Sequence, residues 1–362
     1  MLNVSRLNPL IFGLMIAAKA FAVLLLLSAA CLAQQPVQVF IFAGQSNAGG
    51  VGNPGQLVPV PAWARNAASG WTGAPTVSSD SGIQYERPTK ANSPMLYTAT
   101  VGGGIVNMWC DYEGAIPEVA WPSGKPTGGC TEQSTYGPEL SFLARYRKDH
   151  PGARLAAIKI GLGGTRLEEW MAGGTVHSVL QTMISQAAQR LTAAGLSYKW
   201  AGLIWMQGEN GASGAYSLVN PDPKMAYSYK LRQFLADVRG MTDAGMPVAI
   251  GRISNSMEAP NIIEPLVASG ECKSYSTKYT PYQACVAATE LRRSEQVVVG
   301  GDAGNVWWDN DNLPVNQAGP PEHWYHFTGA GYLAMGERAY AAFTHSAPPA
   351  PVKGRRAAAE VR

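Results

Sequence analysis

Charged residues are scarce in this sequence, and no basic region is concentrated in its central part. Only 15% of the 362 residues are charged, and the formal net charge is +3. Residues 1–33 hold two of the cations, Arg6 and Lys19, and no acid, so removing them lowers the formal charge to +1. The pair Arg355-Arg356 lies in an Ala/Pro-rich tail, where we expect it to be solvated. Nucleic-acid binding is therefore not supported.

The sequence also lacks an apolar run of the length that a membrane span needs. The strictly apolar run near the N-terminus, 21–27, is far shorter than the roughly 20 residues of a transmembrane helix. Cations precede this run and small residues follow it, which is typical of an export signal. We therefore expect a signal peptide over 1–33 and a secreted or periplasmic protein, with an uncleaved N-terminal anchor as the alternative. Cys31 also suits lipoprotein processing, but Ser28 stands where that signal normally has an aliphatic residue.

Cysteine is rare, and four of the five cysteines follow residue 33: Cys110, Cys130, Cys272 and Cys285. An even number in an exported chain indicates disulfides, and pairing of sequence neighbours gives Cys110–Cys130 and Cys272–Cys285, among three possible pairings. Each such bridge would stabilise its loop by about 2–4 kcal/mol. The spacing lacks the repeated Cys-x-x-Cys of a zinc site, so we expect no metal.

Five short apolar runs alternate with helical patterns along the chain. The runs are 37–43, 154–160, 200–206, 247–252 and 296–300. Their near-continuous hydrophobicity predicts strands that are covered on both faces, as in a parallel sheet. Apolar stripes at helical spacing span 176–191, 231–241 and 332–343, the last of them after Thr328, a suitable N-cap. The pattern predicts a three-layer α/β/α domain over 34–345.

Between the first two runs lies a long segment with little periodicity. Residues 48–136 are rich in Gly, Pro, Ser, Thr and Trp. Such a long loop inside a compact domain is usually functional, so we expect an insertion that forms a wall of an active-site cleft. A disordered linker is the alternative, which the expected disulfide and the aromatic residues argue against. The Pro/Ala-rich stretch 346–362 is expected to be a disordered tail.

Four segments carry side chains suited to chemistry, and each lies at or just beyond the carboxyl end of a predicted strand. They are 44–47, 161–165, 205–210 and 323–329, the last before the final helix. In a parallel sheet the carboxyl ends of the strands share one edge, so these segments can converge.

These segments resemble the motifs of one hydrolase family. They are Gly44-Gln45-Ser46-Asn47, the stretch 159–170 with Gly163-Gly164-Thr165, Trp205-Met206-Gln207-Gly208-Glu209, and His326-Phe327-Thr328. In order and spacing the chain resembles the SGNH-type hydrolases, specifically carbohydrate acetylesterases and sialate O-acetylesterases of carbohydrate esterase family six and its relatives, over about 37–345. The resemblance implies a flavodoxin-like five-stranded parallel sheet with a long insertion after the first strand. It also implies hydrolysis of O-acetyl esters on a polysaccharide or sialic acid through an acetyl-enzyme, with no cofactor.

The resemblance assigns a role to each segment. Ser46 would be the nucleophile, and His326 would be the base that a serine hydroxyl needs at neutral pH. The oxyanion would be bound by the backbone N–H groups of Ser46 and of Gly164 (or Gly163), together with a side-chain amide. For that amide Gln207 is favoured. The residues expected to support the site or bind substrate are Gln45, Asn47, Gly163, Thr165, Glu209 and Asn210.

Two of these assignments keep alternatives. Asn210 is the rival of Gln207 as the amide donor. For Glu209 two interpretations are equally supported: a buried carboxylate that orients the site, or an ordinary acid of a loop.

The acid partner of the histidine is the main departure from the family pattern. The family usually has an acid three residues before its histidine, and here that position is His323. Glu322 is the nearest carboxylate and is our assignment, while Asp309 or Asp311 could fold back from the preceding loop. A backbone carbonyl could also hold the imidazole of His326 in a Ser–His dyad. A metal site at the two histidines lacks a third ligand at suitable spacing.

Two other functions were weighed against the esterase. A non-catalytic carbohydrate-binding protein on the same scaffold is consistent with the altered position at His323. A secreted lipase is disfavoured because the predicted cleft wall is rich in Gly, Ser and Trp rather than aliphatic residues.

Overall fold

The computed structural model describes residues 35–50, 96–101, 104–110, 137–193, 195–212, 222–270, 272–274, 277–315 and 326–345. The chain divides into two units, Met1–Pro36 and Val37–Arg362, and the second contains every element described below. The expected signal peptide, 1–33, and the expected disordered tail, 346–362, lie outside the described residues.

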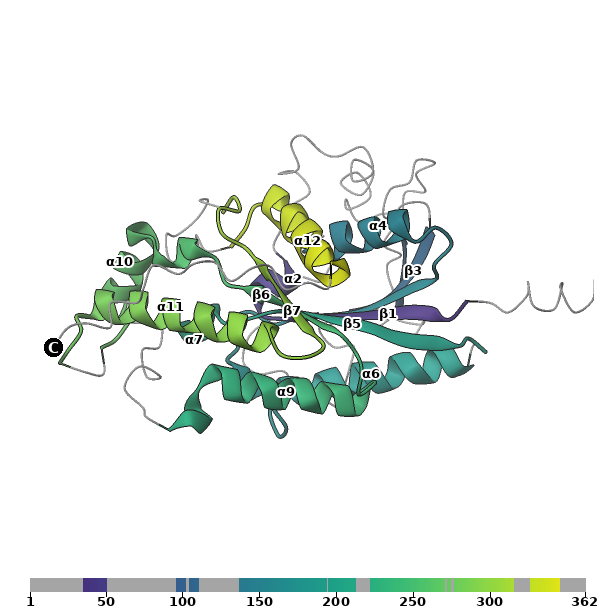
Figure 1. Cartoon of the computed structure of the whole chain (residues 1–362), viewed down its shortest axis with the longest axis horizontal. Coiled ribbons are helices and arrows are strands. Elements are labelled where there is room, and N and C mark those ends of the chain that lie inside the picture. Colours follow the sequence, from purple (N-terminus) through teal and green to yellow (C-terminus); the bar gives the residue numbers. More distant parts are fainter. Residues whose placement is uncertain are drawn as a thin grey trace, which may run out of the picture. The chain divides into compact units, whose positions relative to one another are not determined.

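The described strands form one sheet in the order β2-β3-β4-β1-β5-β6-β7. Figure 1 shows the sheet between α12 (Gly329–Thr344) and α4 (Glu139–Asp149) on one side and α9 (Tyr227–Met241) and α6 (Thr175–Ala193) on the other. Its parallel core confirms the predicted five-stranded sheet and comprises β4 (Leu155–Gly161), β1 (Val37–Gly44), β5 (Tyr198–Met206), β6 (Val248–Arg252) and β7 (Asn305–Asp309). In the central register Gly44 is level with Gly161 on one side and Met206 on the other. Three strands therefore end together at one edge of the sheet.

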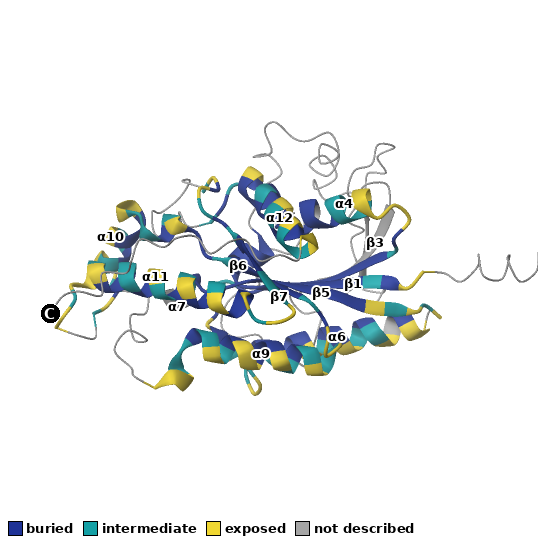
Figure 2. Ribbon diagram, viewed as in Figure 1, coloured by how far each residue is buried: buried dark blue, intermediate teal, exposed yellow. Residues whose placement is uncertain are grey.

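Both faces of the central strand are buried, which explains its near-continuous hydrophobicity. In β1, Val39 and Ile41 belong to one apolar cluster, and Phe40 and Phe42 belong to the cluster on the opposite face. Successive side chains of a strand point to opposite faces, so a strand between two helical layers is apolar at every position. Figure 2 shows the buried sheet between helices whose outer faces are exposed.

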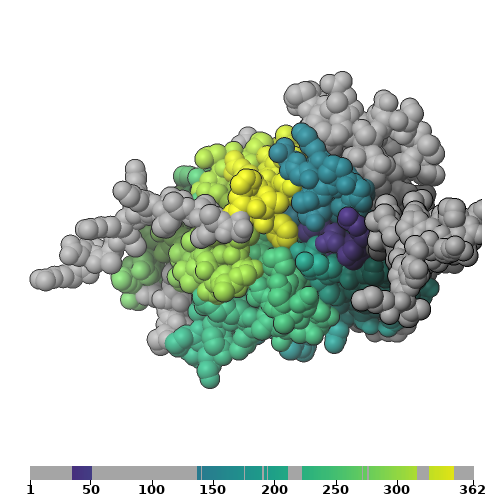
Figure 3. Space-filling model, turned by 45° about the vertical axis from the view of Figure 1, so that its right-hand side comes forward, coloured from purple at the N-terminus to yellow at the C-terminus, as the bar shows by residue number. Residues whose placement is uncertain are grey.

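Helices cover these two faces, and three of them, α6, α9 and α12, were predicted from apolar stripes, whereas α4 was not. The first cluster contains side chains of α6 and α9, and the second contains those of α4 and α12. Although distant in sequence, α4 and α12 lie side by side (Figure 3). Ser141 Oγ donates to Leu333 O at 2.7 Å, and a Cβ on Gly336 would come within 2.1 Å of that hydroxyl. A glycine in α12 therefore permits the close approach of the two helices.

The remaining described helices are short, apart from α11. They are α2 (Ser46–Gly49), α5 (Leu167–Trp170), α7 (Glu209–Ala212), η2 (Pro223–Met225), η3 (Asn255–Glu258), α10 (Pro260–Ala268) and α11 (Pro281–Gly300). The predicted disulfide Cys272–Cys285 is confirmed, with a Cα–Cα distance of 5.9 Å, and it joins the segment after α10 to α11. None of the helices in the described ranges has both the length and the apolar character of a transmembrane segment.

The prediction of a strand at 296–300 is wrong. These residues are the last turns of α11, and the fifth strand of the parallel core is β7, which starts at Asn305. The run of three valines favours a strand locally. A capping box at the start of α11 favours a helix instead: Thr280 Oγ1 accepts from Gln283 N at 3.2 Å, and Gln283 Oε1 accepts from Thr280 N at 3.0 Å. Because this helix packs on the sheet through residues such as Val299, tertiary contacts override the local preference.

Part of the expected loop-rich insertion, 48–136, is strand. β2 (Leu96–Val101) and β3 (Gly104–Cys110) form an antiparallel pair, and β3 joins the parallel core beside β4. The sheet thus has two described strands more than were predicted. Both segments contain β-branched and aromatic residues, which favour strand. Cys110 ends β3, but Cys130 lies outside the described residues, so the bridge Cys110–Cys130 stays a prediction.

Candidate active site

The serine predicted as the nucleophile lies at a sharp turn between β1 and α2. The strand ends at Gly44, whose φ of 144° is rarely adopted by residues with side chains. A Cβ on Gly44 would lie 1.8 Å from the carbonyl oxygen of Met206, so this position requires glycine. Ser46 begins α2 and is 4% exposed. The turn places its hydroxyl at the carboxyl edge of the sheet, where open α/β sheets bind ligands.

His326 meets Ser46 at this edge. Its Nε2 lies 2.9 Å from Ser46 Oγ, although 280 residues separate the two in sequence. Phe327 is 1% exposed and pairs with Val315 in an antiparallel bridge. Thr328 caps α12, its Oγ1 accepting a backbone N–H of the first turn at 3.2 Å. A buried neighbour and a capped helix therefore hold the backbone on the C-terminal side of the imidazole.

The glycine-rich segment after β4 lies against the serine turn. Leu162 N donates to Gly44 O at 3.1 Å, which joins the two segments directly. Gly163 is half-buried, while Gly164 is exposed and has a φ of 72°. The left-handed conformation at Gly164 bends the backbone so that this loop stays at the edge beside Ser46.

Two side-chain amides of the third segment bind this glycine loop. Gln207 Nε2 donates to Thr165 O at 3.1 Å, and Asn210 Nδ2 donates to Gly164 O. Thr165 is buried, and its own hydroxyl donates to Leu162 O at 2.8 Å. The two residues that compete for the oxyanion role in the sequence therefore both hold the backbone around Gly164.

Gln45 connects the first segment with the third. It is 2% exposed, and its Oε1 accepts the backbone N–H groups of Gly208 at 3.1 Å and Asn210 at 3.4 Å. Its own N–H donates to Met206 O at 3.0 Å. Gln45 thus braces the residue before Ser46 against the turn that follows β5.

Glu209 is buried and binds the residue after Ser46. It is 3% exposed, and its Oε1 accepts from Asn47 Nδ2 at 2.7 Å. Burial raises the pKa of the Glu209 carboxyl, and the bond from Asn47 opposes that rise in part. Its second oxygen, Oε2, is buried and has no hydrogen-bond partner among the described residues. Of the two descriptions left open by the sequence, this environment matches a buried orienting group better than a loop acid.

Two residues of the site region carry no signal in the sequence. Tyr227 and Gln296 both donate to the carbonyl oxygen of Gln207, at 2.9 and 2.7 Å. Burial raises the pKa of Tyr227 to about 12, and the guanidinium of Arg292, 3.9 Å from the ring centroid, opposes the rise. Tyr227, from α9, and Gln296, from α11, therefore hold the backbone of Gln207. In the sequence neither residue is next to any of the four segments.

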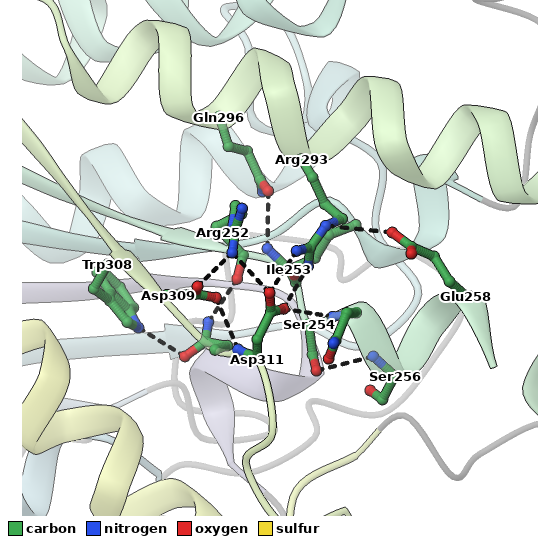
Figure 4. Close-up of polar contacts among 12 residues, drawn as sticks. Arg252, Ile253, Ser254, Ser256, Glu258, Arg293, Gln296, Trp308, Asp309 and Asp311 are labelled. Carbon is green, nitrogen blue, oxygen red and sulfur yellow. Dashed lines mark hydrogen bonds and ion pairs between the residues drawn. The ribbon is translucent and has the colours of Figure 1, made fainter. Parts of the chain in front are cut away.

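Asp309 and Asp311, considered above as partners of the histidine, bind arginines instead (Figure 4). Arg252 Nη2 contacts Asp309 Oδ2 and lies 2.7 Å from Asp311 Oδ2. Arg293 binds Asp311 through two nitrogens, each at 2.7 Å from a carboxylate oxygen. Within the described part of the chain, neither carboxylate bonds to His326.

The remaining acid candidate is Glu322, the residue before His323. Glu322 and His323 lie outside the described residues, so the role of Glu322 stays a prediction. In the ranges that the structure describes, no group of three or more His, Cys, Asp or Glu side chains is arranged to hold a metal ion.

The fold and the side chains at the carboxyl edge of the sheet together define a class of protein. A parallel α/β/α sheet carries a serine after its first strand, a glycine loop after the neighbouring strand, an amide-bearing turn after a third and a histidine before the last helix, which is the arrangement of the SGNH-type hydrolases. A family model described as carbohydrate esterase, sialic acid-specific acetylesterase matches residues 36–300. The chain belongs to this family, and its enzyme class is that of a carbohydrate O-acetylesterase.

Comparison with individual proteins gives more distant relationships. No curated protein matches the sequence significantly. Similar solved structures include a protein from Arabidopsis thaliana (15% identity, TM-score 0.46, covering 85% of this chain and 98% of that one) and NanS (14%, 0.45, 86% and 98%). Another is XAC1771, a carbohydrate acetylesterase from Xanthomonas citri (14%, 0.42, 84% and 55%). At these identities the likeness concerns the fold alone.

Proposed function

We propose that this protein is an exported serine esterase that removes O-acetyl groups from a carbohydrate through an acetyl-enzyme. The observation that carries the proposal is the 2.9 Å contact between His326 Nε2 and Ser46 Oγ. A serine hydroxyl is a weak nucleophile at neutral pH unless a base lies beside it. A positioned imidazole supplies such a base and contributes about 10²–10⁴-fold in rate. Membership of a carbohydrate esterase family supports the ester as the bond that is cleaved.

In the acylation step, Ser46 Oγ attacks the carbonyl carbon of the acetyl group while His326 Nε2 takes the hydroxyl proton. The electron pair of the carbonyl bond moves to its oxygen, which forms the oxyanion of a tetrahedral intermediate. When the intermediate collapses, the bond to the sugar oxygen breaks and His326 returns the proton to that oxygen. The acetyl group remains on Ser46 as an ester.

The oxyanion is proposed to be stabilised by three hydrogen-bond donors. We assign these to the backbone N–H groups of Ser46 and Gly164 and to the side-chain amide of Gln207. One N–H of that amide donates to Thr165 O, and the other serves the oxyanion. Loss of one such donor typically costs about 10²–10³-fold, or roughly 2.7–4 kcal/mol. Asn210 then acts on the loop backbone rather than on the substrate.

In the deacylation step, a water molecule attacks the acetyl-Ser46 ester while His326 accepts its proton. Collapse of the second intermediate returns the proton to Ser46 Oγ and releases acetate. No cofactor takes part in either step. Glu322 is proposed as the carboxylate that orients the imidazole and stabilises its charged form.

The substrate is proposed to be an acetylated carbohydrate, either a polysaccharide or a sialic acid. The family's specificity for sialic acid supports a sialic acid, and the Gly-, Ser- and Trp-rich composition of 48–136 supports a carbohydrate-binding wall of the cleft. The N-terminal pattern over 1–33 supports export to the periplasm or the medium, where such substrates occur.

Substitution of the proposed nucleophile tests the function. We expect Ser46→Ala to abolish acetate release from p-nitrophenyl acetate, acetylated xylan, acetylated pectin and O-acetylated sialic acid, because it removes the hydroxyl that forms the acetyl-enzyme. Ser294→Ala, which changes an exposed serine in α11, is the matched control and should keep full activity. A fluorophosphonate probe should label the wild type and the control but not Ser46→Ala.

Unchanged turnover in Ser46→Ala would reject the serine mechanism. A wild type that binds acetylated carbohydrate but neither releases acetate nor takes the probe would indicate the non-catalytic carbohydrate-binding alternative.

A further inference from the structure

Four charged side chains, from the end of β6, the end of β7, the loop after β7 and α11, form a cluster that the proposed mechanism does not use. This arginine–aspartate cluster consists of Arg252, Arg293, Asp309 and Asp311 (Figure 4). Asp311 is its centre, since it receives 2.7 Å contacts from both arginines. The arginine side chains are 11% exposed and that of Asp311 is 18% exposed, so solvent screens these pairs only partly.

The cluster is not an empty anion site, because its own carboxylates occupy its cations. Arg252 is bound to both aspartates, and Arg293 is bound to Asp311 and to Glu258 at 3.3 Å. Two arginines and two aspartates also balance in charge. The cluster therefore acts on the chain segment that its side chains hold, and not on a bound anion.

The segment held by the cluster is the loop after β7. Asp311 Oδ1 accepts from Asn255 N at 2.7 Å, and Asp311 N donates to Asp309 Oδ1 at 2.8 Å. Arg338, from α12, donates to the carbonyl oxygens of Asp309 and Asp311 at 2.9 Å each. Asn312 then turns the chain with a φ of 60°. Side chain and backbone of this loop are thus fixed from β6, η3 and α12.

The same loop supports the backbone beside the histidine. Pro314 O accepts from Thr328 N at 2.9 Å and from Thr328 Oγ1 at 3.2 Å. Val315 forms the antiparallel bridge with Phe327, the residue after His326. Only three residues separate Asp311 from Val315. A shift of Asp311 would therefore also shift Val315, whose bridge to Phe327 supports the backbone next to His326.

We infer that Asp311 is a positioning residue for His326, acting through its two arginine pairs and the loop 311–315. This inference rests on the proposed serine mechanism. It assigns to an ion-pair cluster, remote from the reacting atoms, the placement of the base against Ser46. A displacement of about 1 Å in a catalytic group costs on the order of 10²-fold in rate.

The first test compares two aspartates with the same type of partner. Asp311→Asn weakens the pairs with both arginines, while Asp302→Asn weakens the exposed pair in which Arg232 binds Asp302 at 2.7 and 3.2 Å, away from the site. We expect Asp311→Asn to lower kcat on p-nitrophenyl acetate about 10–100-fold, with KM within about twofold, and to slow fluorophosphonate labelling of Ser46 equally. Asp302→Asn should leave both rates within about twofold.

The second test asks whether Asp311 acts through the histidine. On a His326→Ala background, Asp311→Asn should cause no further loss of the residual activity, because the group that it positions is gone. A merely structural role would lower activity again on that background. Arg293→Gln, which leaves Arg252 in place, should give a smaller loss of about 3–10-fold, and Arg293→Lys should recover part of it.

These outcomes separate the inference from the proposed function. If Asp311→Asn matches Asp302→Asn in kcat, or lowers activity equally with and without His326, the positioning role is wrong while the serine mechanism stands. If Asp311→Asn does not fold, the comparison of Arg293→Gln with Arg293→Lys decides, and equal rates in both overturn the inference. A failure of the serine mechanism itself would instead appear as turnover in Ser46→Ala, or as a wild type that neither releases acetate nor takes the probe.

Discussion

Among single residues, the polar side chains next to Ser46 form a continuous chain of hydrogen bonds. The Tyr332 hydroxyl donates to Asn47 Oδ1 at 2.9 Å, and Asn47 Nδ2 donates to Glu209 Oε1 at 2.7 Å. Because the amide is bound on both sides, its orientation is fixed, and α12 and α7 both act on the residue that follows the nucleophile. A buried network of this kind rigidifies the turn when its members are satisfied.

The raised pKa of Glu209 predicts how stability depends on pH. Burial favours the neutral carboxyl in the folded chain, whereas the unfolded chain has the ordinary pKa of about 4.5. Above that pH the unfolded state loses its proton first, so the folded state binds more protons and the free energy of unfolding falls as pH rises through the folded pKa. We expect Glu209→Gln, which keeps an acceptor for Asn47, to lack this fall. Urea unfolding from pH 4 to 8 measures the difference.

Glu290→Gln is the control for this prediction, because Glu290 is exposed on α11. Its stability curve should run parallel to that of the wild type. Parallel curves for Glu209→Gln as well would show that burial does not perturb this carboxyl.

Among the elements, α11 shows how a helix boundary decides a segment whose residues favour strand. Its three consecutive valines precede Gly300, yet the capping box of Thr280 and Gln283 satisfies the first turn at the other end of the helix. Once this helix is started, it carries Arg293 to the arginine–aspartate cluster and Gln296 to the carbonyl of Gln207. The start of this one helix therefore affects both the arginine–aspartate cluster and the backbone of Gln207.

Removal of this cap has a predicted cost. Thr280→Ala should lower the free energy of unfolding by about 1 kcal/mol, within a range of about 0.5–2 kcal/mol, because the N–H of Gln283 loses its acceptor. Guanidinium denaturation measures the change, with Ser294→Ala in the exposed middle of the same helix as the control. An equal effect of the two substitutions would mean that the capping box does not contribute.

In the whole molecule, a buried ion pair joins the sheet to one of its covering helices. Lys159 Nζ, in β4, lies 2.7 Å from Glu139 Oε1, in α4, and the two side chains are 1% and 0% exposed. Glu139 also accepts the backbone N–H of Gly137 at 3.0 and 3.1 Å. Since a buried charge is tolerated only when it is paired, each residue depends on the other.

Breaking this pair from one side should be costly. Lys159→Met leaves the Glu139 carboxylate buried without its cation, and we expect a loss of about 3–5 kcal/mol in the free energy of unfolding. Lys159→Met with Glu139→Leu should recover part of that loss, but not all of it, because Gly137 N loses its acceptor. A double-mutant cycle by urea unfolding measures the coupling, with the exposed pair Arg145–Asp149 as the control. A double variant less stable than Lys159→Met would contradict the explanation.

Local patterns were sufficient for four of the five strands of the parallel core and for the location of the site. Four of the five apolar runs are strands, because a strand covered on both faces is apolar at nearly every position. The helical stripes and the cap at Thr328 were likewise readable, since the period of a helix repeats within a short window. Ser46 and His326 were expected at one edge because parallel strands end together, and their side chains lie there.

What the sequence alone determined is therefore the alternation of four core strands with helices and the motifs that follow those strands. Only the tertiary structure decided that 296–300 is helix, that the insertion adds two described strands, and that Asp309 and Asp311 bind arginines. It also decided which side chains brace the site, such as Tyr227, far from every motif. The physical reason is range: periodicity and capping act within a few residues, whereas a hydrogen bond between distant elements leaves no repeating pattern in the chain.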